Sequence, residues 1–230
     1  MNDRARAVVI GGGITGASVA YHLARAGWTD VVLLDKGELT SGSTCHAAGL
    51  VTSFNPSQTM MRFRRYSIEL YRELGVFETV GSVRFASSAD SLLELRRGVS
   101  RARGIGLEAA IIGPDEAVAL MPSASPAGVH GAVWMPEDGY LDPHGATYAL
   151  ANGARALGVS ILTGTRVTGI ELGADRSVQA VRTDAARIET PVVVNAAGMW
   201  APQVSAMVGA FTPSTPVDHQ HIALKAVPGH

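Results

Sequence analysis

The sequence predicts an α/β fold in which helices pack on a mostly parallel sheet, and three observations support this. Short apolar runs that suit buried strands alternate with segments whose apolar residues recur at helical spacing. The 230-residue chain is 47% hydrophobic and 17% charged, so it can bury a core. Aromatic residues make up only 6% while 26 residues are glycine, which suits close packing of helix on sheet better than an all-β sandwich.

Charge and cysteine content narrow the function classes. The chain carries 19 Lys and Arg residues against 20 Asp and Glu residues, interspersed, for a net charge of −1. No basic stripe is present to neutralise phosphates, so no nucleic-acid partner is expected. Cys45 is the single cysteine, which excludes an internal disulfide framework. The longest apolar stretch is interrupted by three glycines and no targeting segment is recognised, so we expect no membrane span and a cytoplasmic protein.

The strongest short motif lies near the N-terminus. The apolar run Val8–Ile10 suits a buried strand and leads into three glycines with G-x-G-x-x-G spacing, Gly11, Gly13 and Gly16. Apolar residues then recur on one face of a helix, at Ile14, Ala17, Tyr21 and Ala24. A second apolar run, Val31–Leu34, ends in Asp35. Strand, glycine turn, helix and a second strand ending in an acid therefore follow one another in order.

Each feature of this motif has a physical role at a dinucleotide. Gly11 allows a tight turn, Gly13 lets the backbone approach a pyrophosphate, and Gly16 lets the helix pack close to the strand. The helix N-terminus supplies unpaired N–H groups and a positive dipole end. Asp35 can accept hydrogen bonds from a ribose and disfavours a 2′-phosphate, so NADP is not expected. The motif predicts a Rossmann-like dinucleotide-binding unit, since a glycine turn without a ligand would leave Asp35 unexplained.

The loop after the second strand bears on which dinucleotide is bound. Residues 40–50 read Thr-Ser-Gly-Ser-Thr-Cys-His-Ala-Ala-Gly-Leu, which is small and polar at first and then apolar. Hydroxyl and amide groups in such a loop can donate hydrogen bonds to a pyrophosphate, and small residues can lie against a flat ring. The loop favours FAD and argues against an NAD-linked dehydrogenase, which is kept as a third alternative.

Several segments in combination carry a family resemblance that extends over essentially the whole chain. They are residues 42–50, 54–60, 138–143, 193–201 and 219–221. These segments resemble the D-amino-acid-oxidase-like family of FAD enzymes, in particular its dimethylglycine and sarcosine dehydrogenases and oxidases. The resemblance implies FAD as cofactor, held covalently by His46 through its imidazole and the 8α-methyl group of the flavin. From the residues alone, a loop histidine that only hydrogen-bonds to backbone is the simpler interpretation, although a neutral imidazole is a competent nucleophile.

The expected FAD contacts combine the motif, the loop and the resemblance. The start of a strand at Val167 is expected to present backbone atoms to the adenine, although an ordinary strand explains it equally well. The small residues Ala196–Gly198 end a strand without bulk, and the family places this segment beside FAD. Asn195 and Trp200 are expected to be structural. The residues expected to bind the cofactor are Gly11, Gly13, Ile14, Thr15, Gly16, Asp35, Lys36, Ser43, Thr44, His46, Ala48, Gly49, Leu50, Val167, Ala196, Ala197 and Gly198.

Periodicity and helix-boundary residues predict the elements in the middle of the chain. Apolar residues at helical spacing indicate one helix, and an N-cap residue and a proline followed by acids each begin another. The expected elements are, in order, a helix over 59–74, a strand over 82–86, a helix from its N-cap Asp90 to about 103, a strand over 107–112, a short helix from Gly113, and a loop over 121–131.

The remainder of the chain shows one clear helix and several short apolar runs. The helix is ended by Gly158, a residue that accommodates the left-handed backbone at a helix end. The expected elements are a helix over 144–157, strands over 159–162, 167–172, 178–183 and 191–195, and a helix from about 201 to 208.

These elements fit an interleaved plan of two domains. Residues 1–76 and 136–210 would form a discontinuous FAD-binding domain. Residues 77–135 and 211–230 would form part of an α+β substrate-binding domain. The resembling family continues well beyond this length, so the chain is expected to be the N-terminal part of a longer FAD unit, with the substrate domain incomplete.

The resemblance implies oxidation of the C–N bond of an N-methylated glycine-type amine, such as dimethylglycine or sarcosine, with hydride transfer to the flavin. His219 matches a family histidine on the substrate side and is the expected catalytic residue; no metal site is expected. The partners expected are a small N-methyl amine and an electron acceptor, either oxygen or another flavoprotein. The alternative is a non-catalytic flavoprotein-like regulatory subunit that resembles the pyruvate dehydrogenase phosphatase regulatory subunit.

Overall fold

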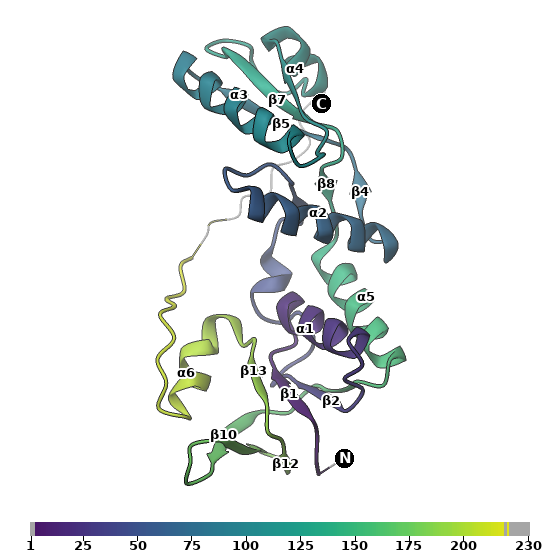
Figure 1. Ribbon diagram of the computed structural model, residues 1–230, viewed down its shortest axis with the longest axis vertical. Coiled ribbons are helices and arrows are strands. Elements are labelled where there is room, and N and C mark those ends of the chain that lie inside the picture. Colours follow the sequence, from purple (N-terminus) through teal and green to yellow (C-terminus); the bar gives the residue numbers. More distant parts are fainter. Residues whose placement is uncertain (1–2, 219, 221–230) are drawn as a thin grey trace. The chain divides into compact units, whose positions relative to one another are not determined.

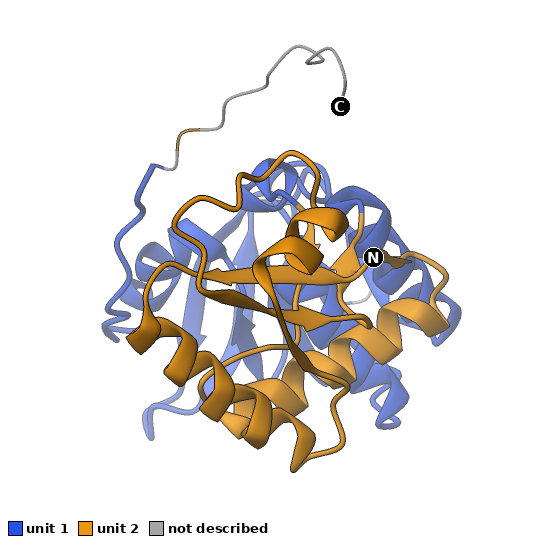
Figure 2. Ribbon diagram, turned by 90° about the horizontal axis from the view of Figure 1, so that it is seen from above, with its two compact units in different colours: residues 1–48, 142–218 blue, residues 49–141, 219–230 orange. Residues whose placement is uncertain are grey.

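The computed structural model describes residues 3–218 and 220, and the chain divides into two compact units (Figure 2). The first unit joins two separate stretches of sequence, residues 1–48 and 142–218. The second unit is formed by residues 49–141 between them. Among the described residues, no helix is both long and apolar enough to cross a membrane.

A four-stranded parallel sheet forms the centre of the first unit. Its strand order is β13 (Val193–Asn195), β1 (Ala7–Ile10), β2 (Val31–Leu34) and β9 (Ser160–Leu162). All residues of β1 and β2 are buried, as expected for apolar runs that are covered on both faces. In register, Val9 lies opposite Leu33 on one side and Val194 on the other. The parallel sheet predicted from the apolar runs is therefore confirmed.

Two helices made largely of small residues pack on each other in this unit, α1 (Ile14–Arg25) and α5 (Pro143–Ala156) (Figure 1). Gly153 of α5 leaves room for the ring of Tyr21 on α1, because a Cβ there would lie 2.7 Å from a ring carbon. Asp142 caps α5 by accepting hydrogen bonds from the backbone N–H groups of His144 and Gly145. The helix therefore begins one residue earlier than predicted, with Pro143 in its first turn.

An antiparallel sheet completes the first unit, formed by β10 (Val167–Leu172), β11 (Val178–Thr183) and β12 (Arg187–Glu189). Val181 and Ile188 are buried in one hydrophobic cluster with Val8 and Val32 of the parallel sheet. The last segment of the unit contains the short helices η2 (Gly198–Trp200) and α6 (Ala201–Ala206). Strands β10 and β11 have the predicted bounds, whereas β12 was not predicted.

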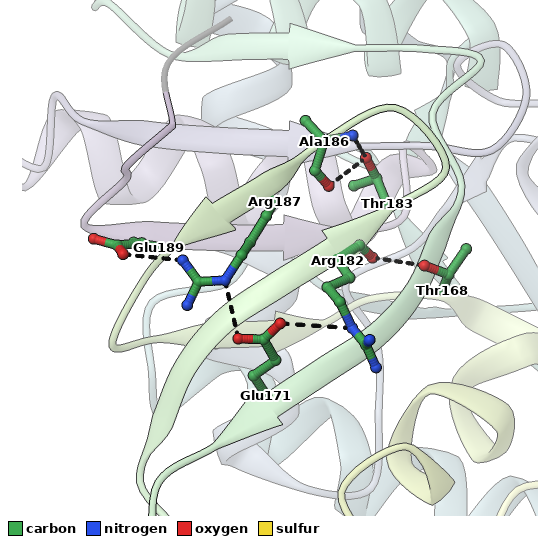
Figure 3. Close-up of polar contacts among 7 residues, drawn as sticks. All are labelled: Thr168, Glu171, Arg182, Thr183, Ala186, Arg187 and Glu189. Carbon is green, nitrogen blue, oxygen red and sulfur yellow. Dashed lines mark hydrogen bonds and ion pairs between the residues drawn. The ribbon is translucent and has the colours of Figure 1, made fainter.

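Charged residues pair across one face of this antiparallel sheet (Figure 3). Glu171 of β10 accepts a hydrogen bond from Arg187 of β12 at 3.0 Å and forms an ion pair with Arg182 of β11 at 3.6 Å. Arg187 also pairs with Glu189 at 2.9 Å, and these two carboxylates raise the pKa of the arginine. Exposed ion pairs of this kind contribute little stability individually.

The second unit contains two three-stranded antiparallel sheets. One has the order β5 (Ser82–Ala86), β7 (Gly131–Met135), β6 (Ala110–Ile112), and the other β3 (Leu50–Val51), β8 (Gly139–Tyr140), β4 (Glu78–Thr79). Its helices are α2 (Gln58–Glu73), α3 (Ala89–Arg103) and α4 (Pro114–Leu120). Its main hydrophobic core is formed by buried apolar side chains that include Met61, Leu95, Val99, Val133 and Met135.

Two sequence predictions in this unit are corrected by the structure. Ser88, and not Asp90, caps α3, and it does so in a reciprocal capping box with Ser91. Asp90 lies in the first turn of the helix, where its charge is also favourable. The strand expected over 107–112 is limited to β6, because pairing with β7 begins only at Ala110; Leu107 and Ala109 are buried in the hydrophobic core without joining the ladder.

Asp138 is a fully buried carboxylate that ties together three segments of the second unit. One oxygen accepts hydrogen bonds from the backbone N–H (2.8 Å) and the hydroxyl (2.6 Å) of Ser53, and the other accepts one from the hydroxyl of Ser82 (2.6 Å). Burial of a carboxylate is tolerated when donors replace its lost hydration.

We expect Asp138→Ala to lower the free energy of unfolding by about 2 to 4 kcal/mol, because it leaves buried donors on Ser53 and Ser82 without an acceptor. The measurement is urea-induced unfolding followed by circular dichroism. Glu108→Ala removes an exposed carboxylate in the same unit and serves as the control. Equal stability of the two variants would contradict the role given to Asp138.

Candidate cofactor-binding site

The glycine turn after β1 is a place of close backbone approach. Gly11 has φ +116°, a conformation that residues with side chains rarely adopt. A Cβ on Gly11 would overlap the carbonyl oxygen of Ala196, and a Cβ on Gly16 would overlap the carbonyl oxygen of Gly11. The end of β13, the turn and the first turn of α1 therefore meet without intervening side chains.

This contact leaves the N-terminus of α1 at the surface of the turn. The backbone N–H of Ile14 donates to the hydroxyl of Thr44 at 3.1 Å. The N–H groups of Gly13 and Thr15 have no acceptor among the described residues. Unpaired donors at the positive end of a helix dipole form a ready site for an anion such as a phosphate.

Asp35 lies at the end of β2, where the sequence analysis expected an acid. One carboxylate oxygen accepts a hydrogen bond from the N–H of Gly12 at 2.6 Å, and the other accepts from the N–H of Gly37 at 2.8 Å. These two bonds fix the carboxylate beside the glycine turn. Because each oxygen has a further lone pair, the group can still accept hydrogen bonds from two hydroxyls of a ligand.

The loop after β2 is fastened to the glycine turn through Thr40. This residue is buried and has φ +71°, a strained value for threonine that three contacts maintain. Its N–H donates to the carbonyl of Gly12 (3.0 Å), its carbonyl accepts from the N–H of Cys45 (3.2 Å), and its hydroxyl is hydrogen-bonded to Nδ1 of His144 (2.7 Å). The loop consequently brings Ser43 and Thr44 to the N-terminus of α1.

These elements enclose a pocket of about 440 Å³ that lies entirely within the first unit. Its size falls in the range of roughly 300–1,000 Å³ that is typical of small-molecule and cofactor sites. Most of the predicted cofactor-binding residues line it, namely Gly11, Gly13, Ile14, Thr15, Asp35, Lys36, Ser43, Thr44, Val167, Ala196, Ala197 and Gly198.

The other predicted residues lie elsewhere. Gly16 is buried behind the turn, and its role is the close helix packing described above. His46 and Ala48 are exposed and do not line the pocket. Gly49 and Leu50 belong to the second unit. His219 lies outside the described residues.

The pocket also has walls that the sequence analysis did not predict. They include Ser41, Gly42, Thr165, Arg166, Trp200, Gln203, Val204 and Met207. Trp200 had been expected to be structural, although it stands only two residues after Gly198 and therefore within the same short helical turn. That proximity to a predicted contact is the signal that could have found it.

Charge in the pocket is concentrated on three lining residues, Asp35, Lys36 and Arg166. The ammonium nitrogen of Lys36 lies 3.4 Å from the centre of the Trp200 ring. No group of three or more histidine, cysteine or acidic side chains suited to a metal occurs among the described residues. The pocket thus combines small residues, anion donors, one acid and two cations.

Comparisons with known proteins agree with this arrangement. Rat dimethylglycine dehydrogenase is 42% identical over 164 residues, which cover 68% of this chain and 19% of the relative. The mouse pyruvate dehydrogenase phosphatase regulatory subunit is 37% identical over 69% of this chain and 19% of its own length. The solved L-proline dehydrogenase of P. horikoshii superposes with a TM-score of 0.86 at 30% identity, over 91% of this chain and 57% of that one.

The chain therefore spans about a fifth of the length of these curated relatives and a little over half of that solved structure. Residues 6–230 match the family of FAD dependent oxidoreductases termed DAO, which is nearly the whole chain. The chain belongs to the DAO family of FAD-dependent oxidoreductases.

Proposed function

We propose that the first unit binds FAD and that the chain supplies the FAD-binding part of an oxidoreductase acting on N-methylated glycine-type amines. The observation that carries the proposal is the pocket in which unpaired N–H groups of α1 lie beside the fixed carboxylate of Asp35. This is the pairing that a dinucleotide needs, because a diphosphate requires donors while a ribose requires an acceptor for its hydroxyls.

The residues present fit the cofactor. Gly13 and Thr15 would hold the diphosphate through their backbone N–H groups, assisted by the hydroxyls of Ser43 and Thr44. Asp35 would hold the ribose, and Val167 at the start of β10 would face the adenine. The turn has no room for side chains at Gly11 or Gly16, so its backbone stays open to a ligand.

Bound FAD would supply the redox chemistry by accepting a hydride from a C–H group next to the amine nitrogen. The first unit contributes binding and orientation of that cofactor. His219 stays the predicted catalytic histidine. Division of the chain into an FAD-binding domain of residues 1–76 and 136–210 and a partial substrate-binding domain of 77–135 and 211–230 also stays a prediction.

The substrate class rests on the relatives rather than on the pocket. The rat relative is a dimethylglycine dehydrogenase, so a small N-methylated amine is the proposed substrate, with oxygen or another flavoprotein as the proposed electron acceptor. That relative is named mitochondrial, and the cytoplasmic location expected from the sequence stays a prediction.

The regulatory-subunit alternative has one observation in its favour, the 37% identity to the mouse phosphatase regulatory subunit. It is less supported, because the amine dehydrogenase relative is more similar over the same share of the chain. An absorbance scan of the longest available form of the protein separates the two. Dimethylglycine or sarcosine should bleach the flavin spectrum of an amine dehydrogenase, and a spectrum unchanged by either amine would favour the regulatory alternative.

We expect the purified chain to bind FAD and not FMN alone, because the contacts proposed above are to the diphosphate and the adenosine ribose, and FMN lacks both. Gly13→Leu should abolish binding, since its side chain would enter the pocket at the N-cap of α1. Titration calorimetry measures the binding of FAD and of FMN to the unaltered chain and the binding of FAD to the variant. Gly113→Leu is the matched control: Gly113 is also a helix N-cap with a similar extended backbone, and it has open space around it. Loss of binding in neither variant, or in both, would contradict the proposed site.

We also propose that His46 attaches covalently to the flavin, as the family resemblance implies. His46 ends the short helix η1 (Ser43–His46), whose first two residues line the pocket, and its imidazole is exposed. Flavin should remain with the protein after acid precipitation, and His46→Ala should release it into the supernatant. A colourless precipitate from the unaltered protein, made after flavin loading, would contradict attachment while leaving non-covalent binding intact.

A further inference from the structure

We propose that Trp200 is a cofactor-positioning residue: its indole holds the ammonium group of Lys36 at the pocket wall, where that group binds the diphosphate of the bound dinucleotide. The proposal rests on the proposed function and adds to it a residue and an interaction. Lys36 alone was a predicted contact, whereas the aromatic partner that orders it comes from the structure.

The two side chains come from separate segments and meet at the pocket. Lys36 follows β2, Trp200 ends η2, and both line the cavity. The ammonium nitrogen lies 3.4 Å from the centre of the indole, well inside the distance at which a cation is attracted by the face of tryptophan. Tryptophan is also the aromatic residue for which this attraction is strongest.

No competing partner removes Lys36 from this position. No carboxylate forms an ion pair with it in the part of the chain that the structure describes. The nearest acid in sequence, Asp35, has both oxygens engaged by the N–H groups of Gly12 and Gly37. The ammonium group therefore keeps its hydrogen-bond donors available for a ligand.

The indole itself is fixed relative to the glycine turn. The backbone N–H of Trp200 donates to the carbonyl of Ala197, which is next to Ala196, the residue that contacts Gly11. The ring lies against Gly42, where a Cβ would come within 3.3 Å of a ring carbon, so glycine leaves the room that the ring occupies. These contacts fix the position of the aromatic ring, and with it the ammonium group, relative to the glycine turn at the N-terminus of α1.

A lysine held in this way suits a diphosphate for a physical reason. The free side chain is a flexible four-carbon stem, and its charge must be ordered when it binds a phosphate. Contact with the indole orders the stem before the ligand arrives, so less conformational entropy is lost on binding. A purely packing role for Trp200 would instead support the pocket wall whether or not residue 36 carries a charge.

The test measures binding of ADP, FAD and adenosine to the purified full chain by titration calorimetry, at low and at high potassium chloride concentration. Lys36→Met should weaken ADP and FAD binding about tenfold and reduce the salt dependence, while adenosine, which has no phosphate, should bind as before. Trp200→Leu should weaken ADP binding about fivefold, and Trp200→Phe less. The double variant Lys36→Met/Trp200→Leu should bind ADP no more weakly than Lys36→Met alone.

Fluorinated tryptophans provide a readout that packing would not move. Fluorine withdraws electron density from the ring face with little change of shape, so ADP affinity should fall stepwise with the number of fluorine atoms. In the Lys36→Met variant the ADP affinity should not change with the number of fluorine atoms. This comparison also controls for fluorination of Trp28 and Trp134, which are replaced together with Trp200. Trp28 contacts Arg6 in a similar pair, 3.8 Å from ring centre to guanidinium carbon, away from the pocket, so Trp28→Leu should leave ADP affinity unchanged.

The outcomes distinguish this inference from the proposed function. Unaltered protein that binds neither FAD nor ADP would overturn the proposed function and the inference together. Normal binding with no effect of Lys36→Met, with additive effects in the double variant, or with a fluorine series that is equally steep in both backgrounds would overturn the inference alone.

Discussion

The arrangement of the site depends on the absence of side chains where β1, α1 and β13 converge. The carbonyl of Gly11 occupies the place of a Cβ on Gly16, and the carbonyl of Ala196 occupies that of a Cβ on Gly11. Side chains accept from only part of this turn: Asp35 takes the N–H of Gly12 and Thr44 takes that of Ile14, while the N–H groups of Gly13 and Thr15 have no acceptor among the described residues. The same glycines that allow the fold thereby leave donors free for a ligand.

The loop that faces these donors contains a strained residue, Thr40, whose backbone is left-handed. A left-handed threonine persists only when its surroundings hold it in that conformation. Here the carbonyl of Gly12, the N–H of Cys45 and the imidazole of His144 do so. The result is that Thr44, four residues later, meets the N–H of Ile14 and closes one side of the pocket. Strain in the loop is thus linked directly to the shape of the binding site.

Local patterns in the sequence predicted the long and buried elements and most of the pocket. Apolar runs located β1 and β2, and glycine spacing with Asp35 located the turn and the acid. Two-residue strands such as β3 and β8 lack enough length for a period of two, and β12 contains only one buried residue, Ile188, between charged neighbours. The proximity of Trp200 to Gly198 could have placed it at the pocket, but its contact with Lys36, more than 160 residues away, is contained in no local pattern.

The acid Asp35 and the cation Lys36 line the same pocket but offer different groups to a ligand. Asp35 accepts hydrogen bonds from the N–H groups of Gly12 and Gly37, which fix the carboxylate, and each of its oxygens keeps a further lone pair for a ligand hydroxyl. Lys36, adjacent in sequence, turns to the face of Trp200 instead of pairing with that acid. Asp35 and Lys36 therefore do not pair with each other. Backbone amides hold the acid and an indole holds the ammonium group. The acid is left as an acceptor for hydroxyls, and the ammonium group as a donor to phosphate oxygens.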